Sequence, residues 1–131
     1  MKGTYILVLF LREDIDATIG SLGKLNFPEG AYLYVGSAMG DYGSSSLINR
    51  VKRHLVWSSE KKIFWHIDYL LNNLLISVNR VFLIPSLQRL ECVIASELSQ
   101  VCDDSILNFG SSDCYCPSHL FFFQNLGCIK H

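Results

Sequence analysis

The feature that most constrains the fold is the apolar run at residues 3–11, which is rich in β-branched and aromatic side chains. Such a composition predicts a buried β-strand. Further strands are predicted at residues 24–27, 31–36, 76–84 and 119–123. A chain of 131 residues fits one domain. We therefore expect a single α+β domain over residues 1–131, with a small mixed sheet of about three to four strands flanked by α-helices.

Two amphipathic helices are predicted between these strands. In the first, Leu47, Val51 and Leu55 form an apolar stripe, and any serine of the preceding loop at residues 40–46 could cap its start. The second has the clearest helical periodicity of the chain. Its apolar stripe consists of Leu87, Leu90, Ile94, Leu98 and Val101.

Composition and charge exclude several classes of protein. Half of the chain is apolar and 18% is charged, which excludes a disordered chain. The apolar run is followed by charged residues 12–14 where a secretory signal needs small ones, and no apolar stretch approaches the ~18 residues of a membrane span. The five cysteines form no regular disulfide framework. We expect a soluble, cytoplasmic protein of a reducing compartment with no membrane partner.

Net charge sets a limit on nucleic-acid binding. The formal net charge is −1 and the isoelectric point is about 6.4, whereas a protein that holds many phosphates by charge alone is basic. Positive charge is nevertheless concentrated between positions 50 and 62, at Arg50, Lys52, Arg53, Lys61 and Lys62. This patch predicts a local contact with DNA, and a solvated helix face is the alternative.

The end of one predicted strand and the helix after it bring together groups that suit a phosphate. Arg50 and His54 are four positions apart, so they project to one side of the helix, where they border the apolar stripe at the rim of the core. Tyr34 and Gly36 end the strand at residues 31–36, and Tyr32 shares the face of Tyr34 by alternation. An arginine fork beside an imidazole, a phenol and an accessible backbone favours an anion site over a core.

Glu91 is the candidate metal ligand. Its spacing from the apolar stripe places it near the buried side of the second helix, where a carboxylate should be paired or bound to a metal. A salt bridge to Arg89 or Arg50 is the alternative. Glu97, on the opposite flank of the stripe, is the competing ligand.

His66 and Asp68 are a further candidate pair. The segment at residues 65–71 is expected to be extended at first and helical after Asp68. A strand would present both side chains on one side, where they could pair or help to hold a metal. Packing of this segment in the core is the interpretation that we favour.

A cysteine-rich loop invites comparison with zinc sites, because thiolates and imidazoles are zinc ligands. Cys114, Cys116 and His119 lie close together in the sequence, and a fourth ligand would have to come from Cys102 or Cys128. The spacing is not that of a standard zinc finger. Zinc is therefore not the metal that we expect, and buried thiols are the alternative.

The ordered set Gly3-Thr4-Tyr5, Tyr34-Val35-Gly36, Arg50, His54 and Glu91 resembles the GIY-YIG nuclease superfamily. More narrowly, the chain resembles a branch of small prokaryotic domains, some of them fused to endonuclease III. The features of this branch are Gly20–Gly23, Phe27–Gly30, Tyr34–Ala38, Arg53-His54, Trp65–Leu71 and Gly110–Cys114. The resemblance runs from residue 3 to about residue 123. The gap between the two tyrosine motifs is longer than in typical members, which predicts an insertion around residues 12–30.

The resemblance implies hydrolysis of phosphodiester bonds in DNA with the help of one Mg²⁺ or Mn²⁺ ion. Tyr5 would lie beside the attacking water as its general base, and Tyr34 would position water or phosphate. Arg50 would stabilise charge on the phosphoryl oxygens, and His54 would assist the base or a phosphate oxygen. Glu91 would hold the metal.

The resemblance also implies lesser roles and leaves alternatives. Gly36 would let backbone approach the substrate closely, and Ser112 and Asp113 would form a wall of the cleft together with His66 and Asp68. The runner-up function is a catalytically silent nucleic-acid-binding or docking module with the same fold. A third interpretation is an interaction protein stabilised by metal at the cysteine loop.

Overall fold

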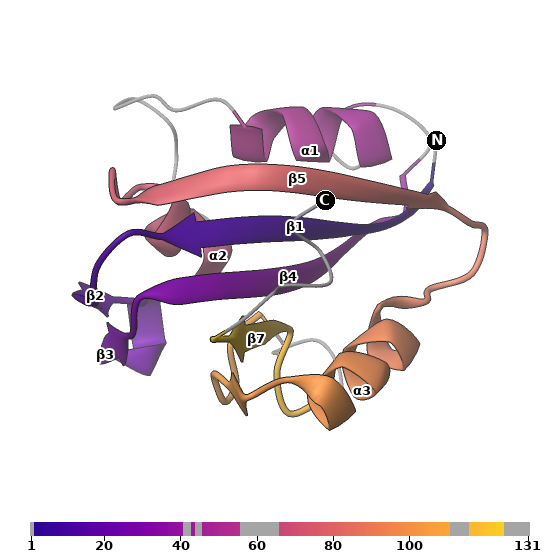
Figure 1. Ribbon diagram of the computed structural model, residues 1–131. Coiled ribbons are helices and arrows are strands. Elements are labelled where there is room, and N and C mark those ends of the chain that lie inside the picture. The colour runs from indigo at the N-terminus through magenta and orange to yellow at the C-terminus, as the bar shows by residue number, and fades with distance from the viewer. Residues whose placement is uncertain (1, 41–42, 44–45, 56–65, 111–115, 125–131) are drawn as a thin grey trace.

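A five-stranded sheet forms the centre of the computed structural model, which describes residues 2–40, 43, 46–55, 66–110 and 116–124. The strand order is β5-β1-β4-β7-β6, and every neighbouring pair is antiparallel (Figure 1). The strands are β1 (Gly3–Leu11), β4 (Gly30–Ala38), β5 (Ile76–Pro85), β6 (Asp104–Ser105) and β7 (Leu120–Phe123). The α+β class is confirmed. The sheet is larger than expected because β6, with two residues, has no period to detect, and it is antiparallel rather than mixed.

In the described part of the chain, three α-helices cover the two faces of this sheet: α1 (Leu47–Leu55), α2 (His66–Leu71) and α3 (Glu91–Val101). Alternate residues of β1, beginning with Tyr5, pack on α1 and α2 in the larger core cluster. The residues between them, such as Val8, pack on the side of α3. Among the described residues, no helix is long and apolar enough to cross a membrane.

Helix α1 differs from its prediction at one position. The predicted serine cap is confirmed at Ser46, whose Oγ accepts a hydrogen bond from the Asn49 amide at 3.4 Å. Leu47 and Val51 are buried as predicted, but Leu55 is 50% exposed and His54 takes its place in the core. Successive residues of a helix are about 100° apart around its axis. Position 54 therefore lies closer than position 55 to the face that carries positions 47 and 51. The expectation that His54 only borders the core is therefore wrong.

The other two helices also differ from expectation. Helix α2 begins at His66, so the segment is not extended up to Asp68. Helix α3 begins at Glu91, and Leu87 lies before it with 86% of its surface exposed. Ala95 is the fully buried residue of α3. The predicted stripe is thus confined to the middle of the helix, where Ile94 and Leu98 pack against the sheet.

A second sheet occupies the predicted insertion. Strands β2 (Ile15–Thr18) and β3 (Lys24–Phe27) form an antiparallel pair, joined by the short helix η1 (Gly20–Leu22). Strand β3 was predicted and β2 was not. The hairpin packs Ile15 and Phe27 into the larger core cluster. Since it follows the C-terminal end of β1, it extends the fold at the end opposite to Tyr5.

Candidate functional site

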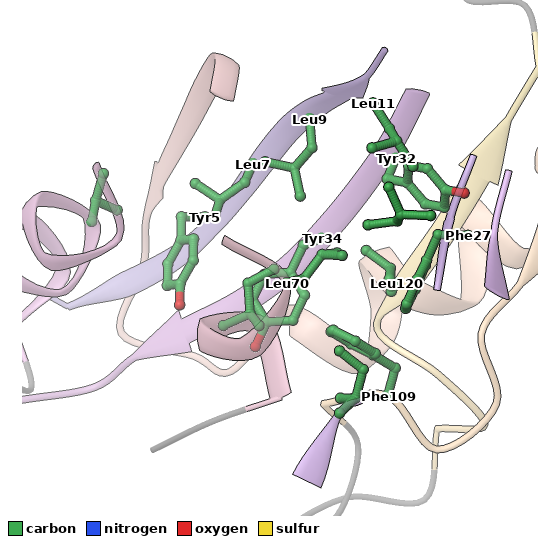
Figure 2. Close-up of a cluster of buried hydrophobic side chains, with 14 of the residues drawn as sticks. Tyr5, Leu7, Leu9, Leu11, Phe27, Tyr32, Tyr34, Leu70, Phe109 and Leu120 are labelled. Carbon is green, nitrogen blue, oxygen red and sulfur yellow. The ribbon is translucent and has the colours of Figure 1, made fainter. Parts of the chain in front are cut away.

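The first two predicted site residues lie side by side on neighbouring strands. Figure 2 shows Tyr5 and Tyr34 projecting to the same side of the sheet, and their ring centroids are 6.3 Å apart. The antiparallel register places Gly36 directly opposite Tyr5. A Cβ atom on Gly36 would overlap the Tyr5 ring. Glycine is therefore required so that the phenol can lie across β4.

Tyr5 is hydrogen-bonded to His54. Its Oη lies 2.7 Å from Nε2 of His54, and both side chains are buried. The other ring nitrogen, Nδ1, lies 3.9 Å from Oδ1 of Asp68. A carboxylate on that side favours the tautomer with its proton on Nδ1. Nε2 is then the acceptor for the phenol proton of Tyr5.

Asp68 is fixed by Arg53 rather than by His66. The Arg53 guanidinium donates to both carboxylate oxygens of Asp68, at 2.7 and 3.1 Å. His66 instead accepts a hydrogen bond from the Gly110 amide at 2.9 Å on Nδ1, and burial lowers its pKa. His66 and Asp68 thus bond to different partners, because α2 is helical here and is not a strand that would place both side chains on one side.

The two phenols hold their protons at neutral pH. Burial raises the pKa of Tyr5 well above its usual value, and the charges of Glu91 and Asp68 add to this rise while Arg50 opposes it. Burial likewise raises the pKa of Tyr34, with the same charged neighbours acting in the same directions. Tyr5 can therefore accept a proton only if it passes its own proton to another base.

Arg50 reaches the outer edge of β4. Its guanidinium donates to the carbonyl of Ser37 at 3.0 Å. Two residues earlier, the amide of Val35 donates to the carbonyl of His119 at 2.9 Å. Residues i and i+2 of a strand direct their backbone groups to the same edge, about 7 Å apart. Arg50 and His119 are therefore neighbours along this edge, beyond the end of the β4–β7 pairing at Tyr34.

Glu91 approaches the same edge from the other face. Its Oε2 lies 3.9 Å from Nδ1 of His119, and its Oε1 lies 3.7 Å from the exposed guanidinium of Arg89. The salt bridge to Arg89 that we considered is thus present. The charges of both Glu91 and Arg50 act on the pKa of Tyr5 and Tyr34. The cation and the carboxylate thus act electrostatically on the two phenols from separate elements, α1 and α3.

The remaining candidates of the predicted nuclease site are less informative. Ser112 and Asp113 lie outside the described residues, as do Lys61 and Lys62 of the basic patch. Within the described part of that patch, Arg50 and Arg53 bond to Ser37 and Asp68, and Lys52 is exposed. Glu97, the competing metal ligand, is exposed. Tyr32 is structural, since its hydroxyl donates to the Pro28 carbonyl at 2.6 Å.

A separate group of potential metal ligands adjoins Glu91. One ligand atom from each of Cys92, Cys116 and His119 lies within 4.8 Å of the others. Burial lowers the pKa of His119, and the Glu91 carboxylate opposes that shift. Sequence reasoning missed Cys92, because it is distant in sequence from the cysteine loop. Cys114 and Cys128 lie outside the described residues, and Cys102 is not part of the group.

A cavity of about 300 Å³ lies at the other end of the sheet, next to Leu11 and Gly30. The β1–β4 register pairs these two residues, six positions along β1 from Tyr5. The cavity is therefore distant from the two phenols and takes no part in the site described above.

Comparison with known proteins adds one result. A family model described as domain of unknown function DUF123 matches residues 4–131. No curated protein and no solved structure matches the chain.

Proposed function

The chain belongs to the DUF123 family, and we propose that it is a GIY-YIG-like, metal-dependent endonuclease that hydrolyses phosphodiester bonds in DNA. The observation that carries this proposal is the 2.7 Å contact between Tyr5 Oη and His54 Nε2, beside the charges of Arg50 and Glu91. A phenol, an acceptor imidazole, a guanidinium and a carboxylate around one strand edge are the groups that phosphodiester hydrolysis uses.

Tyr5 and His54 act together as the base. The attacking water gives its proton to Tyr5 Oη while Tyr5 gives its own proton to His54 Nε2. Burial raises the pKa of Tyr5 and so disfavours a phenolate. The coupled transfer avoids this cost, because Tyr5 never exists as a free phenolate. Asp68 lies 3.9 Å from the far nitrogen of His54, where it stabilises the imidazolium that results. This role resembles the part of the carboxylate in catalytic triads.

Arg50 stabilises the charge that develops on the phosphoryl oxygens. Its hydrogen bond to Ser37 holds the guanidinium at the strand edge. Arginine remains protonated at working pH and offers planar pairs of donors to phosphate oxygens. Since the guanidinium is half-buried, its charge is less screened than that of an exposed residue.

Glu91 is the residue that would hold the Mg²⁺ or Mn²⁺ ion. Mg²⁺ binds through one or two carboxylates and keeps several waters and substrate oxygens, so a single partly exposed carboxylate suits it. The Glu91 side chain is 13% exposed, whereas both oxygens of Asp68, on α2, are already bonded to Arg53. When bound, such an ion supplies positive charge and a polarised water beside the phosphate.

Nicking of supercoiled plasmid and cleavage of single-stranded and branched DNA in Mg²⁺ or Mn²⁺ test this proposal. Arg50→Ala and Glu91→Ala should each lower the rate on the order of 10²-fold or more, while far-ultraviolet circular dichroism remains that of the wild type. The matched controls are Arg80→Ala on β5, which lies outside the basic patch, and Glu97→Ala on α3, because both side chains are exposed. If the Arg50 and Glu91 variants cut like the wild type, the proposal fails.

The burial of the phenols favours a second function, a nucleic-acid-binding module without turnover. Tyr5 is 2% exposed and Tyr34 is 6% exposed, so neither offers much surface to a substrate. A titration of DNA affinity against salt in the presence of EDTA separates the two functions. Binding without cleavage under any divalent metal supports the module, and metal-dependent nicking eliminates it.

A further inference from the structure

The start of α3 and the loop before β7 meet at a set of soft metal ligands. Cys92 is the second residue of α3, and Cys116 and His119 are three positions apart in the loop. Their ligand atoms lie within 4.8 Å of one another. Donors on a tetrahedral zinc are about 3.8 Å apart, given Zn–S bonds of ~2.3 Å and Zn–N bonds of ~2.0 Å. Small side-chain rotations would close the remaining distance.

The surroundings of this group suit a zinc ion. Cys92 and Cys116 are half-buried and His119 is buried, so the donors are shielded from bulk water. Glu91 Oε2 lies 3.9 Å from Nδ1 of His119, so a carboxylate adjoins the ring of this ligand. A carboxylate behind a ligating histidine is the usual outer-shell partner, since it fixes the ring and its tautomer.

The first turn of α3 has little apolar packing to hold it in place. Ala95 is its buried residue, whereas Val93 is 60% exposed and Val101 is 68% exposed. Apolar packing therefore restrains the middle of the helix more than its first turn. A metal between Cys92 and the loop would fix that first turn against the edge of β4, to which His119 is bonded through Val35.

We propose that Cys92, Cys116 and His119 bind a Zn²⁺ ion, which fixes the start of α3 and with it the carboxylate of Glu91. Two thiolates and an imidazole are preferred zinc ligands, whereas Mg²⁺ and Mn²⁺ prefer oxygen. This site is chemically distinct from the oxygen-ligand site of the proposed nuclease. These three residues are the ligands found in the described part of the chain, and a fourth coordination position remains.

Metal content tests the zinc site directly. Full-length protein purified under reducing conditions without chelators should contain about one zinc per chain by elemental analysis. After removal of the metal, added Co²⁺ should give thiolate-to-cobalt charge-transfer absorption. Cys92→Ser and Cys116→Ser should each weaken zinc binding on the order of 10- to 100-fold, comparable with or larger than the effect of losing an outer-shell partner.

Cys102→Ser is the matched control. Cys102 is also half-buried, but its Sγ contacts the Ser99 carbonyl and it is not part of the group. This variant should keep its zinc. Wild-type protein with reduced thiols that binds no stoichiometric zinc overturns the proposal, and so does equal loss of zinc in Cys102→Ser.

Thermal melting covers the case in which a cysteine variant fails to fold. The melting temperature of metal-free wild type should rise when zinc is added, because a ligand that binds the folded state stabilises it. No rise, or a Cys92–Cys116 disulfide that persists in reductant, contradicts the proposal. None of these measurements requires DNA cleavage, so the zinc site and the nuclease function fail or succeed separately.

Discussion

The two faces of the central sheet are held in different ways. The face under α1 and α2 buries large side chains, and Tyr5, Leu47 and Leu70 are each at most 2% exposed. The face under α3 has a smaller buried cluster, to which α3 contributes Ala95 as its fully buried residue. Figure 1 shows α3 near the short strand β7, at the side of the sheet opposite to the edge strand β5.

This difference bears on how the site residues are positioned. On the α1 face, packing and the contacts of His54 with Tyr5 and Asp68 fix the polar groups inside an apolar core. On the α3 face, Glu91 is held through polar neighbours, His119 and Arg89, in a region with little apolar burial. Packing therefore orients the proposed base, whereas polar and charged neighbours orient the proposed metal carboxylate.

The largest expected effect is on the free energy of unfolding. A substitution where α1 packs on the sheet should lower it more than one where α3 packs on the sheet. Leu47→Ala on α1 should lower the free energy of unfolding by about 2–5 kcal/mol, because Leu47 is fully buried. Leu98→Ala on α3 should cost less, on the order of 1–2 kcal/mol, since Leu98 is only partly buried. Urea unfolding of both variants measures this. Equal losses would show that the two faces are equally well packed.

Gly36→Ala should disturb the α1 face at the proposed base. The added methyl group would overlap the Tyr5 ring, so the expected loss of stability is about 1–3 kcal/mol. The hydrogen bond between Tyr5 and His54 should be disrupted as well, which the imidazole resonances in NMR spectra would report. Ser37→Ala, one residue later on the same strand, is the control because this position already carries a Cβ.

Tyr5→Phe should change the response of stability to alkaline pH. In the unfolded chain a tyrosine titrates near pH 10, whereas burial raises the pKa of Tyr5 in the folded state. Above about pH 10 the unfolded state thus loses a proton that the folded state retains, so stability falls as pH rises. The Tyr5→Phe variant should show a shallower fall over this range, measured by urea unfolding at a series of pH values. Its loss of stability at pH 7 should be about 1–3 kcal/mol, because the hydrogen bond to the buried Nε2 of His54 is lost on one side only.

The smallest expected effect is a gain in stability. Thr4 is fully buried, and among the described residues its Oγ1 has no hydrogen-bond partner. Thr4→Val removes this hydroxyl and keeps the branched shape that suits a strand, so we expect a gain of about 1 kcal/mol. A loss measured by the same urea unfolding would mean that the hydroxyl has a partner in solution.

Local patterns in the sequence determined most of the helices and strands. The apolar run at residues 3–11, the strand ended by Pro85 and the helix capped by Ser46 all follow from composition and spacing, because each pattern acts over a few neighbouring residues. The two-residue strand β6 and the short β2 carry too few residues to show a period. The resemblance identified the site residues as candidates, and their roles stay predictions.

Tertiary structure alone decided how the polar residues are partnered. The sequence placed Arg50 and His54 on one helix side, yet only the packed sheet shows that His54 meets Tyr5 and that Arg50 bonds to Ser37. Cys92 joins Cys116 and His119 across a long separation in the chain, which no local spacing encodes. Periodicity reports which face of an element is apolar, whereas the partner of a polar group depends on which elements the fold brings into contact.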